Sequence, residues 1–499
     1  MKILWIVKAI EFIDPIGIML LSALAKQEGH ECHLGILSRE NVLEKIDRLK
    51  PDVVAYSAST GEHKYYLEFN DVLKSRNKDL FTVMGGPHTT FYPECIKGSS
   101  FDAICEGEGE EAFLELLACL ENGRDISDIK NIIAKNGVSN GTRQLHSDLD
   151  SLPFPDRSLF YDNTEMGQFP LKSFMASRGC PYPCTYCFNH AFREMYKGKG
   201  RVIRRHSVEH IIGEILEVKK RYALDCVKFY DDIFVYEVDE WFLEFVDRYK
   251  KEIALPFHCL TRATLATEDV VRLLKEAGCF SISMSIESGN ADLRNQILKR
   301  KMSDEEIIKA FHLCKKYDIK TFSNNILALP FSTIENDVET LDLNIKCKVS
   351  FAEFPIFHPY PKTELGNLCI EKGLYDTKYE ALHMSYMNRS PLSCFSEKEK
   401  NIQKNLSELG LLVVWFPSLR NLVVQYLIYL PHNRLFFYVY YLSKAYLVNT
   451  RIYPLKLGIG RLWKFFVMSL NLERFKHTND RAIGRPEQKE TSVDAKAAT

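Results

Sequence analysis

The chain has 499 residues, more than one hydrophobic core usually supports, so we expect two or three domains. Hydrophobic residues make up 46% and charged residues 26% of the sequence, which excludes global disorder and a membrane-embedded protein. The formal net charge of -1 provides no overall attraction to nucleic acid. Met1 and Lys2 lead directly into the strand-like ILWIV, so we expect no signal peptide and a cytoplasmic location, in which the 14 cysteines stay reduced.

Residues 1–125 alternate short apolar runs, such as DVVAYSAS and FTVMGG, with stretches of helical periodicity. This alternation predicts an α/β fold with a doubly wound, Rossmann-like parallel sheet. Ligands of such sheets bind beyond the carboxyl ends of the strands, where small residues let the backbone approach them closely. The predicted loops at these ends contain the candidate binding residues Ser57, Ser59, Thr60, Gly85, Gly86, Gly107, Glu108 and Gly109.

Residues 126–165 are rich in Asn, Asp, Ser and Gly and contain SLPFPDRS, which is typical of an extended linker. Over residues 166–390, six strand-like runs each precede a helix-like stretch or the end of the unit, which predicts a partial (β/α)6 TIM barrel. Ser303 and Glu306 are placed to form a capping box at one of its helices. Polar residues follow the predicted strands on the face that carries catalysis in such barrels: Asp231, Arg262, Glu287 and Asn325.

Residues 391–476 contain several apolar and aromatic runs, and none reaches the roughly 18 residues needed to span a bilayer. Nine Lys or Arg and one Glu occur between residues 411 and 476, a balance that suits peripheral contact with anionic lipid. We favour the alternative that this segment is a helical C-terminal extension that caps the open barrel. Residues 477–499 are predicted to be a disordered tail.

The string RGCPYPCTYCFNH, residues 178–190, places Cys180, Cys184 and Cys187 on one short loop after a predicted strand. Such close spacing lets a single loop supply three thiolate ligands to an iron–sulfur cluster and leaves the fourth iron without a protein ligand. The alternative is a structural zinc site completed by His190. We disfavour it, because the loop follows the first strand of a β/α series and does not lie between small ribbons.

This loop resembles the signature of the radical S-adenosylmethionine (SAM) superfamily. The resemblance implies a 4Fe-4S cluster on Cys180, Cys184 and Cys187, with the amino and carboxylate groups of SAM on the open iron. It also implies that Tyr186 lies near the adenine. Leu329 replaces the glycine that usually precedes the proline of the fifth strand. By the same resemblance, the SAM-binding residues are Tyr186, Asp231, Arg262, Glu287, Ser288 and Asn325.

The N-terminal unit resembles the cobalamin-binding domain that precedes many radical SAM barrels, in PDVVAYSAST, VMGGPHTTFYPE and FDAICEGEGEEAF. The resemblance assigns cobalamin to the strand-end loops of residues 1–125 given above. The Asp-x-His-x-x-Gly motif that supplies a cobalt ligand elsewhere is absent. His88 is therefore expected to be a polar turn residue, with a cobalt ligand as the alternative.

These resemblances imply an enzyme that takes an electron from an external flavodoxin- or ferredoxin-type donor and cleaves SAM to a 5'-deoxyadenosyl radical. Our first hypothesis is a cobalamin-dependent C-methyltransferase with a small-molecule or lipid-like substrate. The second is an oxidative cyclase or rearrangement enzyme of the tetrapyrrole-cyclase type, and the third is a non-catalytic iron–sulfur or cobalamin sensor. We expect no nucleic-acid partner, because the cluster cysteines and the basic β-barrel of the tRNA methylthiotransferases have no counterpart here.

Overall fold

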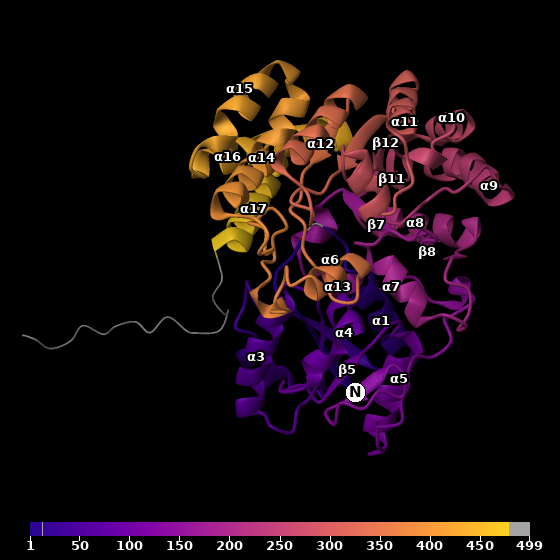
Figure 1. Cartoon of the computed structure of the whole chain (residues 1–499). Helices are drawn as coiled ribbons and strands as arrows, with labels where there is room; N and C mark the ends of the chain where they lie inside the picture. The colour runs from indigo at the N-terminus through magenta and orange to yellow at the C-terminus, as the bar shows by residue number, and fades with distance from the viewer. Residues whose placement is uncertain (12, 479–499) are drawn as a thin grey trace, which may run out of the picture.

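A computed structural model describes residues 1–11 and 13–478. It contains two six-stranded sheets, one from each half of the predicted α/β region, and a helical C-terminal region (Figure 1). The predicted fold class is confirmed. The predicted disordered tail lies outside the described residues, apart from residues 477 and 478.

The N-terminal sheet has the strand order β2-β1-β3-β4-β5-β6, and its first five strands in this order are parallel. Its central strands are buried along most of their length, which explains their nearly continuous apolar sequence. The edge strand β6 pairs antiparallel with β5 and comes from the segment predicted to be a linker. The strands are β1 (Lys2–Val7), β2 (Glu31–Ile36), β3 (Val53–Ser57), β4 (Phe81–Gly85), β5 (Ala103–Cys105) and β6 (Ile132–Ala134).

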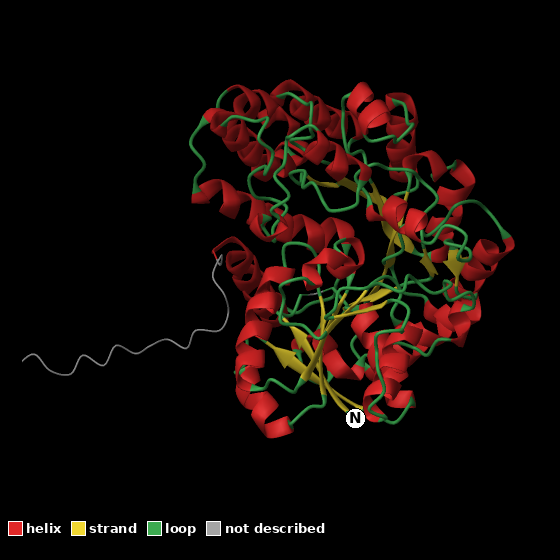
Figure 2. Cartoon of the chain, turned by 60° about the horizontal axis from the view of Figure 1, so that its bottom comes forward, coloured by secondary structure: helices red, strands yellow, loops and turns green. Residues whose placement is uncertain are grey.

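Helices cover both faces of this sheet, as expected for a doubly wound fold (Figure 2). They are α1 (Ile16–Gln27), α2 (Val42–Leu49), α3 (His63–Arg76), α4 (Pro87–Phe91) and α5 (Glu110–Glu121). After them the chain passes through the short turn η2 (Leu149–Ser151) and helix α6 (Ser158–Tyr161) into the second sheet.

The second sheet is parallel throughout, with the sequential order β14-β13-β12-β11-β10-β7 of a partial barrel. Its strands are β7 (Leu171–Phe174), β10 (Cys226–Phe229), β11 (Phe257–Thr261), β12 (Cys279–Met284), β13 (Lys320–Asn324) and β14 (Phe351–Glu353). Its helices are α7 (Phe188–Met195), α8 (Val208–Arg221), α9 (Glu240–Arg248), α10 (Glu268–Ala277), α11 (Asp304–Lys316), α12 (Ile334–Cys347) and α13 (Glu364–Glu371). Two short strands, β8 (Ser177–Arg178) and β9 (Arg204–Arg205), form a separate antiparallel hairpin. The chain between these two strands contains the cysteine loop and α7.

Polar side chains fix where the barrel helices begin. The hydroxyls of Ser207 and Thr267 accept backbone N–H groups at the starts of α8 and α10. The predicted capping box of Ser303 and Glu306 is present at α11. Helix α10 ends at Gly278, whose φ of 104° is readily adopted only by glycine.

The C-terminal region consists of α14 (Glu397–Trp415), α15 (Arg420–Gln425), α16 (Arg434–Leu447) and α17 (Ile459–Thr478). Helix α14 packs beside β14, where the Ser407 hydroxyl donates to the Phe354 carbonyl at 2.6 Å. A Cβ atom at Gly410 would lie 2.7 Å from the Phe354 ring, so glycine allows this close approach. Among the described residues, no helix combines the length and the apolar character needed to cross a bilayer.

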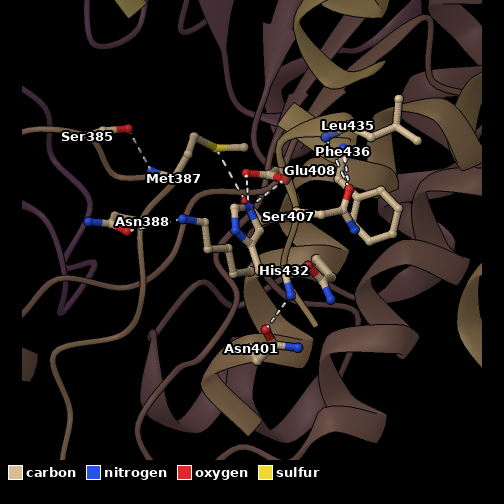
Figure 3. Close-up of polar contacts among 12 residues, drawn as sticks. Ser385, Met387, Asn388, Asn401, Ser407, Glu408, His432, Leu435 and Phe436 are labelled. Atoms are coloured by element: carbon tan, nitrogen blue, oxygen red, sulfur yellow. Dashed lines mark hydrogen bonds and ion pairs between the residues drawn. The ribbon is translucent and has the colours of Figure 1, made fainter. Parts of the chain in front are cut away.

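A hydrogen-bonded histidine–carboxylate pair holds the segment before α16 onto α14 (Figure 3). Glu408 is 2% exposed, and His432 Nε2 lies 3.1 Å from each of its carboxylate oxygens. The Asn401 side chain accepts the His432 backbone N–H at 2.9 Å. A buried carboxylate is costly without a partner, so this pair favours one arrangement of the helices.

Candidate functional site

The cysteine loop runs from β8 to α7, and its conformation depends on Gly179. Gly179 has φ +89°, and a Cβ atom there would lie 2.4 Å from the Val202 carbonyl oxygen. At its other end, Cys187 is the N-cap residue of α7 and donates its N–H to the Cys184 carbonyl at 3.2 Å. Thr185 anchors the middle of the loop through its hydroxyl, which donates to the Ile297 carbonyl at 2.7 Å.

Two of the three thiols, those of Cys180 and Cys187, are poorly suited to act as free nucleophiles. Burial raises the pKa of Cys180 to about 11 and that of Cys187 to about 12, so both are protonated at neutral pH. The charge of a bound metal would deprotonate them. The donor set therefore fits metal ligation and not nucleophilic catalysis.

The spacing of the sulfur atoms distinguishes a cluster from a single zinc ion. Thiolates around one tetrahedral zinc, with bonds of about 2.3 Å, lie about 3.8 Å apart. Within the described chain, only one group of three ligand atoms lies within 4.8 Å of one another, and it contains no cysteine. His190 is turned to other partners, with Nε2 3.7 Å from Glu364 and Nδ1 3.2 Å from the Arg193 guanidinium. The wider thiol arrangement suits an iron–sulfur cube better than a zinc ion.

Two of the predicted SAM residues contact each other directly beside this loop. The Tyr186 hydroxyl donates to Glu287 Oε1 at 2.7 Å, and Arg300 donates to the Tyr186 hydroxyl at 3.0 Å. Glu287 has φ +66°, a conformation that a non-glycine residue rarely adopts, and it bridges to Asn325 of the next strand segment. Arg300 was not predicted from the sequence, because it lies in a Lys-Arg-Lys run that is typical of a solvated surface.

Arg262 also faces the cysteine loop. Its guanidinium lies 4.1 Å from the centre of the Tyr182 ring. The Cys184 sulfur interacts electrostatically with the guanidinium groups of both Arg262 and Arg300. Two guanidinium groups thus flank one cysteine. This placement would stabilise negative charge on a cluster held by the loop.

The other three predicted SAM residues use their side chains within the protein. Asp231 is fully buried and accepts the Ala176 backbone N–H at 3.2 Å, which fixes the strand segment before the cysteine loop. The Asn325 amide donates to the Glu353 carbonyl at 2.8 Å, and the Ser288 hydroxyl accepts the Asn290 N–H at 3.2 Å.

The neighbouring Asp232 was not selected from the sequence, although its carboxylate acts electrostatically on two of the cysteines. The negative charge of its carboxylate contributes to raising the pKa of Cys180 and of Cys187. The same carboxylate accepts a hydrogen bond from the Asn189 side chain. A position at the end of a strand does not say which of two adjacent carboxylates turns toward the loop.

The predicted cobalamin residues lie together at the carboxyl edge of the N-terminal sheet. Ser57 ends β3 and Gly85 ends β4, while Ser59 and Thr60 follow β3. Gly86 has φ +96°, and a Cβ atom there would lie 2.7 Å from the Ala58 nitrogen. The remaining three residues, Gly107, Glu108 and Gly109, form the loop between β5 and α5.

His88 and His63 form a stacked pair under these loops, with ring centres 3.7 Å apart and both side chains fully buried. Burial lowers the pKa of His88 to about 3 and that of His63 to about 4, so both rings are neutral at pH 7. His88 Nδ1 lies 3.1 Å from the Thr60 hydroxyl, but neither Nε2 atom has a hydrogen-bond partner among the described residues. Orphaned buried nitrogens at the ligand edge of the sheet fit a polar ligand there.

Glu108 joins this edge to the cysteine hairpin. Arg204 donates to Glu108 Oε2 at 2.9 Å and Arg178 donates to Oε1 at 3.1 Å. Each strand of the hairpin therefore contributes one arginine that binds this carboxylate. Burial would raise the pKa of Glu108, yet these arginines hold it below its usual value. Gly107 is tightly packed too, since a Cβ atom there would overlap the Tyr196 hydroxyl at 2.0 Å.

Comparison with known families agrees with these two units. The radical SAM superfamily model matches residues 175–343, and the B12 binding domain model matches residues 5–117. An uncharacterized methyltransferase of Pyrococcus horikoshii is 28% identical over 72% of this chain and 79% of its own length. The anaerobic magnesium-protoporphyrin IX monomethyl ester cyclase of Rubrivivax gelatinosus is 27% identical over 66% of this chain and 60% of its own length.

Two further comparisons extend this agreement. The hopanoid C-3 methylase of Methylococcus capsulatus is 24% identical over 64% of this chain and 61% of its own length. A solved structure of the cobalamin-dependent SAM radical enzyme OxsB has a TM-score of 0.63, covers 97% of this chain and 76% of that chain, and is 16% identical. At that identity, the structural likeness shows a common fold.

The fold and the matched models define the class: the chain combines an N-terminal B12-binding domain with a radical SAM domain. Its relatives are cobalamin-dependent methyltransferases and protoporphyrin-cyclase-like enzymes. The cofactors that these domains imply are a 4Fe-4S cluster, SAM and cobalamin.

Proposed function

We propose that the chain is a cobalamin-dependent radical SAM enzyme that methylates an unactivated carbon of a small-molecule or lipid-like substrate. The observation that carries this proposal is the convergence of Tyr186, Arg262 and Glu287 on the cysteine loop, in a chain that also has a B12-binding domain. We further propose that residues 1–125 and 166–390 are the cobalamin and SAM units, joined by residues 126–165 and extended by residues 391–476.

The chain's own residues would bind and orient the reacting groups. We assign the cluster to Cys180, Cys184 and Cys187, and SAM to the six residues predicted from the sequence. When bound, the cluster and SAM supply hydrogen abstraction from carbon, and cobalamin supplies the methyl group. The Tyr186–Glu287 hydrogen bond fixes the aromatic ring beside Cys187, and the Glu287 carboxylate that accepts it is buried.

The experiment is anaerobic reconstitution with iron, sulfide and cobalamin, followed by SAM and a reductant that stands in for the flavodoxin- or ferredoxin-type donor. We expect 5'-deoxyadenosine together with S-adenosylhomocysteine, and loss of both in Cys184→Ala. Cys394→Ala is the matched control, because Cys394 is an exposed cysteine far from the loop in sequence. An intact cluster without either product would contradict the catalytic proposal and favour a sensor.

A second candidate function is an oxidative cyclisation or rearrangement, favoured by the similarity to the Rubrivivax gelatinosus cyclase. It uses the same cofactor sites, so the cysteine variants do not distinguish the two reactions. Product analysis does: methylation consumes a second SAM and forms S-adenosylhomocysteine, whereas cyclisation needs none. Deoxyadenosine without S-adenosylhomocysteine would therefore favour the cyclase.

The lipid-like substrate is supported by the C-terminal region and by the similarity to a hopanoid methylase. Leu435, Leu442 and Tyr446 lie along one face of α16 and are 66%, 57% and 55% exposed. Residues 411–472 contain seven Lys or Arg and no Asp or Glu. Exposed apolar side chains with surrounding positive charge suit peripheral binding of a cytoplasmic protein to an anionic lipid surface.

Vesicle sedimentation tests this contact. The chain should sediment with anionic phosphatidylglycerol vesicles, and Leu435→Glu with Leu442→Glu should release it. Leu243→Glu is the control, because Leu243 is also an exposed leucine, 48%, and lies on helix α9 outside the C-terminal region. Equal sedimentation of all three proteins would contradict membrane contact and leave the methyltransferase proposal intact.

A further inference from the structure

A cluster of two histidines and one carboxylate lies outside the SAM and cobalamin sites. His206 Nδ1 is 3.0 Å and His210 Nδ1 is 3.6 Å from the same atom, Asp150 Oδ1. The two rings are stacked, with centres 4.2 Å apart and planes inclined by 20°, so one ring must turn for both Nδ1 lone pairs to point at a single ion. We propose that Asp150, His206 and His210 bind a divalent transition-metal ion such as Zn²⁺, at a site separate from the iron–sulfur cluster.

The spacing of the donor atoms fits one tetrahedral ion. Zinc bonds to histidine nitrogen and carboxylate oxygen of about 2.0–2.1 Å place neighbouring ligands about 3.3–3.4 Å apart. The two observed separations lie on either side of this value, and all three ligand atoms lie within 4.8 Å of one another. In the described part of the chain, this is the one group of three such side chains with that property.

The sequence spacing places both histidines on one side of the helix start. His206 precedes the N-cap residue Ser207, and His210 is in the first turn of α8, four residues after His206. Their side chains are 13% and 11% exposed, whereas Asp150 is 35% exposed. An ion held there would be anchored from the protein side and open to a water molecule on the other side.

There is room for that water. A cavity of about 40 Å³ borders His206 and His210 and is also lined by Leu152, Met175, Glu214 and the guanidinium-bearing Arg178. This volume exceeds the roughly 10–15 Å³ that one water molecule needs. Three protein ligands and a water would complete the four-coordinate shell that zinc prefers.

A bound ion would replace the 3.0 Å hydrogen bond between His206 Nδ1 and Asp150 Oδ1, but the other hydrogen bonds of Asp150 are compatible with ligation. Its two oxygens accept the Ser207 backbone N–H, each at 3.1 Å, as a cap of α8. A carboxylate has about four lone-pair positions, so one oxygen can accept that N–H and still bind an ion. The positive charge of Arg178 nearby is balanced by Glu108 and Glu110.

The position suggests what the ion does. Asp150 belongs to η2 in the segment between the two sheets, while His206 follows β9 of the hairpin that surrounds the cysteine loop. A metal bridge would therefore tie the connecting segment to the hairpin. It would stabilise the junction of the two units without taking part in the SAM chemistry.

Metal titration of the full chain tests the proposal. The cluster is first reconstituted so that the cysteines are occupied, other metals are removed with a chelator, and Zn²⁺ binding is measured against a competing chromophoric chelator. We expect wild type to bind one Zn²⁺ per chain. In His210→Ala the affinity for Zn²⁺ should be at least about 100-fold weaker, since loss of even a partner outside the ligand shell costs about 10–100-fold in metal affinity. Zn²⁺ should also raise the melting temperature of the wild-type chain and not that of the variant.

Two controls keep the test decisive. Asp150→Asn retains an oxygen for the Ser207 N–H, so a folded Asp150→Asn chain that no longer binds Zn²⁺ separates ligation from folding. His146→Ala removes an imidazole from the same connecting segment and should bind Zn²⁺ normally. Equal Zn²⁺ affinity in wild type, Asp150→Asn and His210→Ala would overturn the proposal. A thiolate charge-transfer band with Co²⁺ would overturn it too, because the ion would then lie on cysteine.

Discussion

Arg157 is the residue whose replacement should test the junction of the two sheets most directly. It lies in the connecting segment and is 5% exposed. Its guanidinium donates to Glu214 of α8 at 2.7 Å and to the Ser173 carbonyl of β7 at 2.8 Å, and lies 3.7 Å from Asp14 of the N-terminal unit. One cation thus neutralises carboxylates from both units.

The expected loss can be worked out from this arrangement. Arg157→Met keeps much of the side-chain volume and leaves the buried carboxylate of Glu214 without its cation. Removing one member of a buried pair costs about 3–5 kcal/mol, chiefly because the remaining charge stays desolvated. Asp14 retains hydrogen bonds from the Tyr161 hydroxyl and the Ser173 N–H, so its share of the loss should be smaller.

Urea unfolding of the full chain, followed by fluorescence, measures the difference. Arg272→Met is the matched control: Arg272 is exposed on α10, its ion pairs with Asp269 and Glu276 are on the surface, and its loss should stay within about 0.5 kcal/mol. The double variant Arg157→Met with Glu214→Gln should recover part of the loss. A cost for Arg157→Met as small as that of the control would refute the reasoning.

Three further predictions concern the barrel. Burial raises the pKa of Asp337 to about 8, so the folded chain keeps a proton that the unfolded chain, with a pKa near 3.9, releases. Stability should therefore fall as the pH rises from about 4 to about 8, and urea unfolding across that range should show a flatter fall in Asp337→Asn. Gly179→Ala should lower cluster content, read from the iron bound per chain, because the new Cβ atom meets the Val202 carbonyl. Tyr186→Phe should weaken SAM binding in calorimetry while cluster content stays normal, since it removes the hydroxyl that donates to Glu287 and accepts from Arg300 but leaves the aromatic ring in place.

Most of the fold could be predicted, because buried parallel strands have nearly continuous apolar sequences. Strands such as β3 and β12 stand out for this reason. The β8–β9 hairpin could not be found in this way, since each strand has two residues and is held by Gly179 and by ion pairs distant in sequence. Strand β6 was hidden for a similar reason, because three apolar residues within a polar segment are not distinctive.

The site was predictable where local sequence carries the chemistry. Three cysteines in close spacing indicate a ligand loop, and Glu287 follows a recognisable strand. Arg300 was not predictable, since its contact with Tyr186 crosses 114 residues and its own sequence surroundings are polar. His63 had no signal either, because a histidine at a helix start is usually solvated, whereas here it is buried against His88.

Glu108 explains why the two units must be considered as one site. This residue was selected as a candidate for the cobalamin edge. Its carboxylate nevertheless binds Arg178 of β8 and Arg204 of β9, the two strands on either side of the cysteine loop. The methyl transfer proposed above requires reacting atoms about 3–3.5 Å apart, and a misplacement of about 1 Å can cost 100-fold in rate. A carboxylate shared by the edge of one sheet and the loop of the other limits such displacement. The distance across the junction is therefore fixed by charge pairing within the chain before any substrate binds.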